Sequence, residues 1–280
     1  MSNEFYEFAK GMHKHGKFEE ARDYFEKALK EEPDSPDILR DYALLLVDYE
    51  KYDDALEIIE KALSIKDDPY SRYIKAKALF GLGNFQEAEK IFLDLKTILK
   101  DAINISADLG DLYFDAGDYE KAIEEYKQAI ATDPFDPVLF NNLALCYFHI
   151  DDYDAAIETL RTAVELDSNN PEIRDNLAMA LYEKGNSSEA IQELQKAIQI
   201  DPDFAQAHVD LSLIYYDSEL YEEAIDEIKK AIEIEPNNSV YHAILSNIYL
   251  KAGKIKEAKE ETEKLLKLIK PDEENKRPAT

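Results

Sequence analysis

The sequence predicts an all-α protein, a right-handed superhelical solenoid of eight antiparallel helix pairs without strands. Three observations lead to this prediction. A pattern of apolar residues recurs every 34 residues, one alanine keeps the same place in every recurrence, and glycines and prolines fall at fixed places between the apolar runs. The segments 117–134, 185–202 and 219–236 show this most clearly, with alanines and prolines in register. Such a fixed period is typical of proteins whose helix pairs stack in one direction.

The recurring alanine sets the boundaries of eight repeats, in which it stands at place 20. The eight alanines are Ala21, Ala55, Ala88, Ala122, Ala156, Ala190, Ala224 and Ala258. The repeats are residues 2–35, 36–68, 69–102, 103–136, 137–170, 171–204, 205–238 and 239–272, and the second is one residue short. We therefore expect one solenoid domain over residues 1–272, followed by a disordered polar tail at residues 273–280.

Each repeat contains the pattern of two helices in succession. Apolar residues at places 4, 7 and 11 form one face of a first helix, and those at places 20, 24 and 27 form the facing stripe of a second. Glycine at place 15 of five repeats predicts a left-handed cap that ends the first helix. Prolines near place 32 end the second helix. Because one pair cannot bury its apolar face alone, neighbouring pairs should stack, with first helices lining a concave surface.

The third repeat departs from this pattern. Lys75 stands at place 7, Leu95 and Lys96 stand at places 27 and 28, and no proline precedes the fourth repeat. We expect irregular stacking here. A tolerated variation in stacking angle is the simpler interpretation, and a functional hinge is the alternative.

The repeat pattern resembles that of the tetratricopeptide repeat family over nearly the whole chain. In the fourth repeat the matching residues are Leu109, Gly110, Tyr113, Ala122, Tyr126, Ala129 and Pro134. The fifth repeat agrees through Leu143, Ala144, Tyr147, Ala156, Leu160 and Ala163, and the seventh through Leu211, Ser212, Tyr215, Ala224, Ile228, Ala231 and Pro236. The resemblance implies a helix-pair solenoid whose place 6 points into the concave groove, where several members of the family bind an extended peptide through asparagine side chains.

Composition excludes several classes of protein. The chain has 61 acidic and 33 basic residues, a net charge of −28 that repels phosphate backbones and anionic lipid surfaces. We therefore expect neither nucleic acid nor membrane as a partner. The single cysteine allows no disulfide framework, and the N-terminal residues lack the apolar core of a signal peptide. A cytoplasmic location is the resulting prediction.

The sequence offers no residues that would carry catalysis. It contains no phosphate-binding glycine loop, no nucleophile elbow and no cluster of Cys or His at metal-ligand spacing, so we expect no enzyme activity, no cofactor and no metal. His208 and His242 share place 4 of adjacent repeats and are interpreted as packing residues rather than as a metal pair. Cys146, at the apolar place 10, is interpreted as a buried, inert thiol.

Two adjacent amides, Asn141 and Asn142, stand inside the first helix of the fifth repeat, where asparagine is unfavourable. Asn142 occupies place 6, as Asn176 does in the next repeat, and five of the eight residues at place 6 are Asn or Asp. An amide offers both a donor and an acceptor to the backbone of an extended peptide. Our hypothesis is that these amides bind such a peptide. The alternative is that asparagine is common at place 6 throughout the family and has no ligand here.

The carboxylate clamp that some members of the family use to bind chaperone tails is missing. Arg40 is the only cation at place 5, Leu44 occupies place 9, and Tyr70 and Ile74 stand where the third repeat would need cations. We therefore do not expect this chain to bind chaperone C-termini.

The predicted groove of repeats four to seven is acidic instead. Places 2, 5, 6, 9, 12 and 13 carry no Lys or Arg in these repeats. Their acids are Asp108, Asp111, Asp115, Glu172, Asp175, Glu183, Asp210 and Asp217. All of these except Glu172, together with Asn141, Asn142 and Asn176, are the ten residues predicted to bind the peptide. An aromatic row at place 12 is interpreted as packing between repeats rather than as ligand contact. The sequence thus predicts a non-enzymatic scaffold that binds a basic, extended segment of another protein.

The last helix supports a second hypothesis. Leu265 stands where most repeats have Ala, and Ile269 stands where repeats four to seven have an acid. The outer face of this helix should therefore be unusually apolar. Weak end-to-end self-association through this face is the alternative function, unless the chain was cut from a longer protein.

Overall fold

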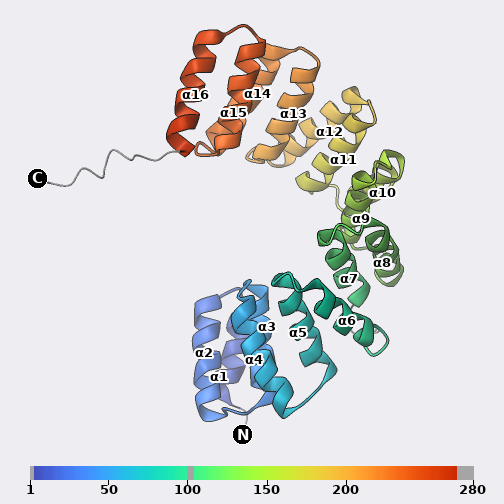
Figure 1. Cartoon of the computed structure of the whole chain (residues 1–280), viewed down its shortest axis with the longest axis vertical. Coiled ribbons are helices and arrows are strands. Elements are labelled where there is room, and N and C mark those ends of the chain that lie inside the picture. The colour runs from blue at the N-terminus through green and yellow to red at the C-terminus, as the bar shows by residue number, and fades with distance from the viewer. Residues whose placement is uncertain (1–2, 100–103, 270–280) are drawn as a thin grey trace, which may run out of the picture. The chain divides into compact units, whose positions relative to one another are not determined.

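The computed structural model describes residues 3–99 and 104–269 and folds them into sixteen α-helices, with no strand among these residues (Figure 1). This confirms the predicted all-α fold of helix pairs. The expected tail, residues 273–280, lies outside the described residues. The chain divides into two compact parts, an N-terminal half (Met1–Pro134) and a C-terminal half (Phe135–Thr280). A single domain over residues 1–272 stays a prediction, and each half is described by itself.

The two halves contain eight helices each. Those of the N-terminal half are α1 (Glu4–Lys14), α2 (Phe18–Glu31), α3 (Pro36–Asp48), α4 (Tyr52–Ile65), α5 (Pro69–Gly81), α6 (Phe85–Lys96), α7 (Ile105–Asp115) and α8 (Tyr119–Thr132). Those of the C-terminal half are α9 (Pro137–His149), α10 (Tyr153–Leu166), α11 (Pro171–Glu183), α12 (Ser187–Ile200), α13 (Ala205–Asp217), α14 (Tyr221–Ile234), α15 (Ser239–Lys251) and α16 (Ile255–Ile269).

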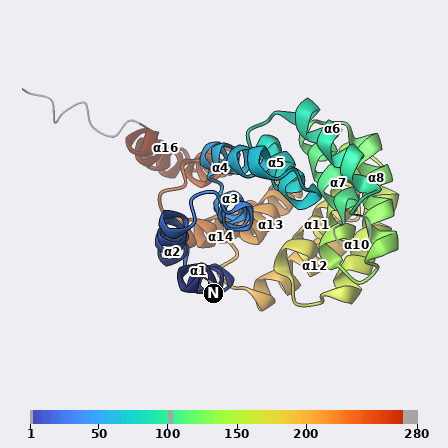
Figure 2. The same cartoon turned by 90° about the horizontal axis from the view of Figure 1, so that it is seen from below.

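Within each half the helices form two layers. Odd-numbered helices are the first helices of the repeats, and each packs on the even-numbered second helix that follows it. Second helices also contact the first helix of the next repeat, as α4 contacts α5 and α12 contacts α13 (Figure 2). Contacts of α3 with α1 and α5, and of α11 with α9 and α13, join neighbouring first helices. We call the surface of the first helices in each half its first-helix face.

Small residues let the helices approach closely. The alanine at place 20 is at most 1% exposed in all eight repeats. Gly110, at place 8 of the fourth repeat, goes further: a Cβ built there would lie 2.6 Å from the ring of Tyr126, which is itself 1% exposed. The absence of a side chain at Gly110 therefore makes room for a large aromatic ring between α7 and α8.

Place 15 ends the first helix in a left-handed conformation in every repeat. The five glycines at this place have φ between 70° and 90°, as predicted. Glu50, Asp151 and Glu219 occupy the same place with φ near 60°. The backbone N–H of Lys51, which follows Glu50, donates to the carbonyl oxygen of Leu46 at 2.8 Å. This bond gives a partner to one of the last carbonyl groups of the helix. In these three repeats the turn thus holds a non-glycine residue in the left-handed conformation that glycine adopts most easily.

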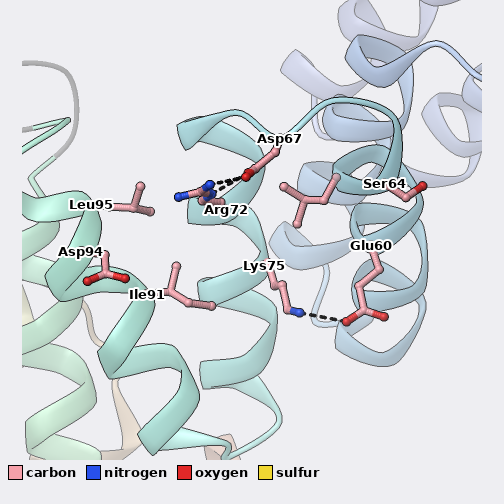
Figure 3. A pocket seen from close by; sticks show the side chains of 9 residues that line it. Glu60, Ser64, Asp67, Arg72, Lys75, Ile91, Asp94 and Leu95 are labelled. Atoms are coloured by element: carbon pink, nitrogen blue, oxygen red, sulfur yellow. Dashed lines mark hydrogen bonds and ion pairs between the residues drawn. The ribbon is translucent and has the colours of Figure 1, made fainter.

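The third repeat differs from its neighbours in the length of its second helix, while the expected irregular stacking stays a prediction. Its second helix, α6, has 12 residues where α4 and α8 have 14. A cleft of about 540 Å³ opens among α4, α5 and α6 (Figure 3). Lys75 reaches across it to Glu60 at 2.9 Å, and Arg72 pairs with Asp67. Charged side chains thus occupy the space that an apolar place 7 would fill, while the hinge interpretation stays a hypothesis.

We expect Gly110→Ala to lower the free energy of unfolding by about 1–3 kcal/mol, because the added methyl group overlaps the buried ring of Tyr126. The matched control is Gly11→Ala in α1, where an added Cβ meets nothing within 4 Å. That change should raise stability by about 0.5–1 kcal/mol, since Ala is the better helix former. Denaturant unfolding of the three proteins measures both effects, and equal midpoints for the two variants would contradict the packing role of Gly110.

Candidate functional site

All ten residues predicted to bind a peptide lie on first helices. Three belong to α7 in the N-terminal half, and seven belong to α9, α11 and α13 in the C-terminal half. These are Asp108, Asp111 and Asp115 on α7; Asn141 and Asn142 on α9; Asp175, Asn176 and Glu183 on α11; and Asp210 and Asp217 on α13. The candidate residues therefore form two groups, one in each half of the chain.

Hydrogen bonds join neighbouring first helices at a spacing of 35 residues. The residue at place 5 of one repeat bonds the residue at place 6 of the next, and in two cases place 12 bonds place 13 in the same way. We call these bonds rungs. They are Tyr6 to Asp41 (2.6 Å), Tyr73 to Asp108 (3.0 Å), Asn176 to Asn141 (2.8 Å), His13 with Asp48 (2.8 Å) and Tyr182 to Asp217. Several predicted site residues thus bind a neighbouring repeat.

The adjacent amides of α9 belong to one of these rungs. Asn176 Nδ2 donates to Asn141 Oδ1 at 2.8 Å, and Asn141 Nδ2 lies 3.4 Å from Asn142 Oδ1. The three amides are therefore side by side across α9 and α11. A primary amide has two donors and an oxygen with two lone pairs, so this rung uses only part of the hydrogen-bonding capacity of each side chain.

The acids of α7 differ in their surroundings. Asp108 accepts hydrogen bonds from Tyr73 at 3.0 Å and Lys77 at 3.4 Å, and burial raises the pKa of its carboxyl group against the lowering effect of Lys77. Asp111 accepts from the Tyr126 hydroxyl at 2.6 Å. Asp115 is exposed at the end of α7, and partial burial and Asp111 raise its pKa. Asp115 is thus the most accessible acid of this helix.

Asp175 and Asp210 stand at the places of a rung, but neither side chain has a donor when both are ionised. They have the spacing of 35 residues, and each is only 6% exposed. Gln206 Nε2 donates to both oxygens of Asp210 at 3.0 Å, whereas Asp175 Oδ1 is among the buried atoms without a hydrogen-bond partner in the described part of the chain. Burial and the neighbouring Asp210 raise the pKa of Asp175 to about 8, and burial raises that of Asp210. The raised pKa of both carboxyls favours protonation of one of them, so that it can donate a hydrogen bond to the other between α11 and α13.

The remaining two acids are exposed. Glu183 ends α11, and Asp217 ends α13, where it accepts a hydrogen bond from the Tyr182 hydroxyl. That bond is the main reason that the pKa of Tyr182 is raised to about 12. Glu183 and Asp217 are therefore placed to attract a cation through solvent.

A set of contacts between first and second helices was not predicted from the sequence. In the last three repeats an Arg or His at place 4 of the first helix bonds a buried or partly buried glutamate at place 23 of the second. The pairs are Arg174 with Glu193 (2.8 Å), His208 with Glu227 (2.7 Å) and His242 with Glu261. The signal was present in the sequence as glutamate at place 23 of four repeats, including Glu125, which pairs with Lys96.

The two histidines consequently bind acids of their own repeats. His242 Nε2 also lies 2.9 Å from the carbonyl oxygen of Pro236, so each ring nitrogen of His242 has a neighbouring oxygen atom. Across residues 3–99 and 104–269, no three His, Cys, Asp or Glu side chains are grouped to hold a metal ion. Cys146 is buried, as predicted, with its Sγ 3.2 Å from the carbonyl oxygen of Asn142.

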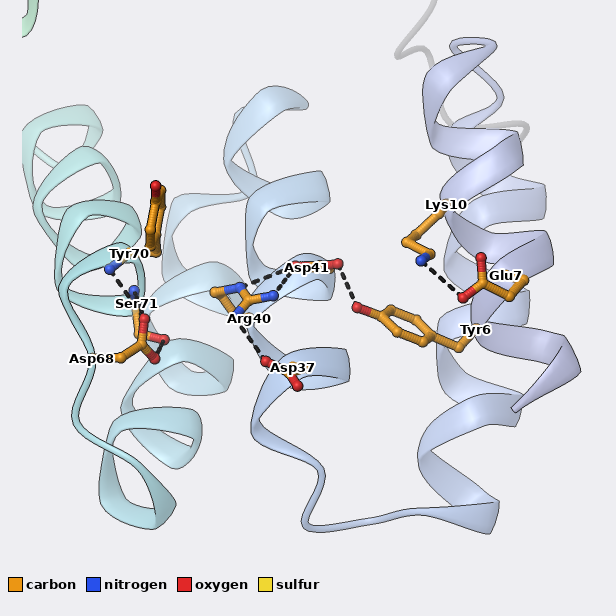
Figure 4. A network of polar contacts seen from close by, with 9 residues as sticks. All are labelled: Tyr6, Glu7, Lys10, Asp37, Arg40, Asp41, Asp68, Tyr70 and Ser71. Carbon is orange, nitrogen blue, oxygen red and sulfur yellow. Dashed lines mark hydrogen bonds and ion pairs between the residues drawn. The ribbon is translucent and has the colours of Figure 1, made fainter. Parts of the chain in front are cut away.

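Arg40, the only cation at place 5, is held by acids of its own helix. Its Nη1 donates to Asp37 at 2.8 Å, and its Nε and Nη2 donate to Asp41 at 3.1 and 3.0 Å (Figure 4). Asp41 in turn accepts from Tyr6. Two carboxylates thus compensate the charge of Arg40.

None of the described helices is long and apolar enough to cross a bilayer.

Comparison with known proteins identifies the repeat. Models described as tetratricopeptide repeat match residues 12–79, 107–171, 151–212, 181–248 and 240–272. A single one of these models accounts for residues 12–79, 151–212 and 181–248, more than half of the chain.

Two curated proteins are similar to part of the chain. Protein IFIT1 homolog B of Homo sapiens is 28% identical over 138 residues, which cover 46% of this chain and 29% of that protein. Cell division cycle protein 27 homolog A of Arabidopsis thaliana is 31% identical over 103 residues, or 36% of this chain and 14% of that protein. The chain therefore spans less than a third of the length of these relatives.

Solved structures share the fold. A crystal structure of MamA protein has a TM-score of 0.54 and 27% identity, over 63% of this chain and 96% of that one. The APC/C hetero-tetramer Cut9-Hcn1 gives a TM-score of 0.67 at 17% identity, over 86% of this chain and 48% of that one. The structure of the human IFIT1 dimer with PPP-AAAA has a TM-score of 0.60 at 20% identity, over 90% of this chain and 69% of that one. The last two likenesses concern the fold alone.

The Asp175–Asp210 pair should make stability depend on pH. The pKa of Asp175 rises from 3.8 to about 8 on folding, so the folded protein binds the proton more tightly, and stability is lost as the pH rises from about 4 to about 8. Asp175→Asn supplies a permanent donor to Asp210. We expect it to raise stability by about 1–3 kcal/mol at pH 8 and to change it little at pH 4.

Thermal unfolding between pH 4 and pH 9 measures this difference. The control is Asp217→Asn, which removes an exposed acid from the same first-helix face and should leave the pH profile unchanged. Parallel pH profiles for Asp175→Asn and the parent protein would show that the buried pair shares no proton.

Proposed function

Because this chain is a member of the tetratricopeptide repeat family, we propose that it is a non-enzymatic interaction scaffold that binds a basic, extended segment of another protein. Proteins of this family generally act as protein-interaction scaffolds, and one structural neighbour, Cut9-Hcn1, is a hetero-tetramer. The first-helix face of the C-terminal half is the proposed site. The observation that carries the proposal is that amides and acids stand together there, while places 2, 5, 6, 9, 12 and 13 of repeats five to seven contain no Lys or Arg.

The amides and the acids have different parts in this proposal. Asn141, Asn142 and Asn176 are adjacent and half-buried, so they can donate to and accept from the peptide groups of an extended chain. Glu183 and Asp217 are exposed and act on Lys or Arg side chains through solvent. Asp175 and Asp210 are too deeply buried for direct contact with the partner, so their part is to hold α11 against α13.

The test uses a synthetic basic peptide and an acidic peptide of the same length, titrated into the protein by calorimetry at low and high salt. Only the basic peptide should bind. PPP-AAAA is a third probe, because it accompanies the human IFIT1 dimer in one of the similar structures. Binding of PPP-AAAA in place of the basic peptide would overturn the proposal, and the net charge of −28 argues against that outcome.

We expect the amide and acid contributions to be separable. Asn142→Ala leaves the Asn176–Asn141 bond in place and should weaken binding by about 1–3 kcal/mol at any salt concentration, because a peptide group loses its partner. Glu183→Gln combined with Asp217→Asn should instead flatten the salt dependence, since exposed charges act mainly by steering. The control is Glu158→Gln with Glu233→Gln, the same charge change on exposed second-helix residues. If both double variants flatten the salt dependence of binding equally, net charge alone causes the effect, and Glu183 and Asp217 have no specific part in it.

Self-association through α16 is the second candidate, and the exposure of its apolar residues favours it. Leu266 and Ile269 are 52% and 59% exposed, whereas Leu265, predicted to face outward, is half-buried. If this face joins copies of the chain, sedimentation should detect dimers at high protein concentration and high salt. Ile269→Glu should then abolish them. The control, Ile255→Glu, changes an equally apolar residue that is 52% exposed at the other end of α16. A monomer under all of these conditions would exclude this function.

A further inference from the structure

A pocket of about 410 Å³ lies on the first-helix face of the N-terminal half, between α3 and α5. Its lining residues are Arg40, Asp41, Leu44, Tyr70, Tyr73 and Ile74. The pocket occurs where the rungs are interrupted. The second repeat is one residue short, so place 5 and the next place 6 are Arg40 and Ile74, only 34 residues apart. Ile74 cannot accept a hydrogen bond, and Arg40 turns to Asp37 and Asp41 of its own helix.

The walls of the pocket are mainly carbon. Ile74 is 4% exposed and forms the floor, Leu44 is half-buried, and Tyr70 is 47% exposed at the rim. Tyr73 donates its hydroxyl to Asp108, so it offers its ring to the pocket rather than its polar end. Water gains few partners in such a space, and an apolar side chain of a ligand would be buried there.

The charges around the pocket identify the residues that would flank this side chain. Figure 4 shows Arg40 held between Asp37 and Asp41 on α3, with Asp68 and Tyr70 on the neighbouring α5 side. Asp37 and Asp41 bond the guanidinium of Arg40, and Asp68 is near enough for Arg40 to lower its pKa. Three carboxylates against one guanidinium disfavour an anionic ligand and favour basic neighbours. The guanidinium plane and the Tyr70 ring are surfaces on which an aromatic ring stacks better than an aliphatic chain does.

We propose that the pocket between α3 and α5 receives an aromatic side chain from a partner segment in which basic residues flank that side chain. The inference rests on the proposed function for the basic flanks and goes beyond it for the aromatic anchor. The N-terminal half would then select the partner by sequence, whereas the exposed acids select it only by charge.

The test compares two synthetic peptides, one with a central Phe between Lys-Arg repeats and one with Ala in place of that Phe. The Phe peptide should bind the full chain about ten-fold more tightly. Leu44→Trp fills the pocket and should abolish this preference while leaving the affinity for the Ala peptide unchanged. Tyr70→Ala, a change at a half-exposed residue that leaves the fold intact, should reduce the preference. Phe8→Ala, which removes an aromatic residue 53% exposed on α1, should not.

A neutral probe separates this inference from the proposed function. N-acetyl-phenylalanine amide carries no charge, so its binding depends on the pocket alone. It should shift the Ile74 methyl resonance in the parent protein and not in Leu44→Trp. If the Ala peptide binds as tightly as the Phe peptide and the neutral probe leaves the Ile74 resonance unchanged, the aromatic-pocket inference is wrong. The scaffold proposal is then unaffected. A shift of Ile74 without binding of either peptide supports the pocket and overturns the basic-segment proposal.

Discussion

Close approach of helices within and between repeats is the constraint on which the rest of this structure depends. The alanine at place 20 is buried in every repeat, and Gly110 makes room for a tyrosine ring that an added Cβ would overlap. Because a helix pair exposes an apolar face on each side, it is stable only against its neighbours. The packing therefore fixes the spacing of first helices, and that spacing determines which side chains meet on the first-helix face.

The rungs follow from this spacing. A residue at place 5 lies opposite place 6 of the next repeat, so a tyrosine or asparagine there binds an acid or amide 35 residues later. The first-helix face is less negative than its acids alone suggest, because Arg40 pairs with Asp41 and Lys77 pairs with Asp108. Burial also raises the pKa of Asp175 and of Asp210. Charge that can act on a partner is concentrated at the helix ends, in Asp115, Glu183 and Asp217.

The pocket at Ile74 and the cleft at Lys75 lie where the repetition fails. Regular repeats fill their own faces with rungs and with buried pairs such as Arg174 with Glu193. No rung forms between Arg40 and Ile74, where the pocket lies, and the third repeat has Lys75 in place of an apolar residue beside the cleft. Both cavities lie in the N-terminal half, whereas the amide cluster lies in the C-terminal half. The proposed functions of the two halves differ for this reason.

The sequence by itself determined the helix pairs, their caps and the buried alanines, because each depends on residues near in sequence and on a period repeated eight times. It also placed the ten candidate residues on first helices. Only the tertiary structure decided which of these residues meet: Asn176 bonds Asn141, and Asp175 stands beside Asp210. These contacts depend on the angle and offset between neighbouring helices, which packing sets and a residue pattern leaves open.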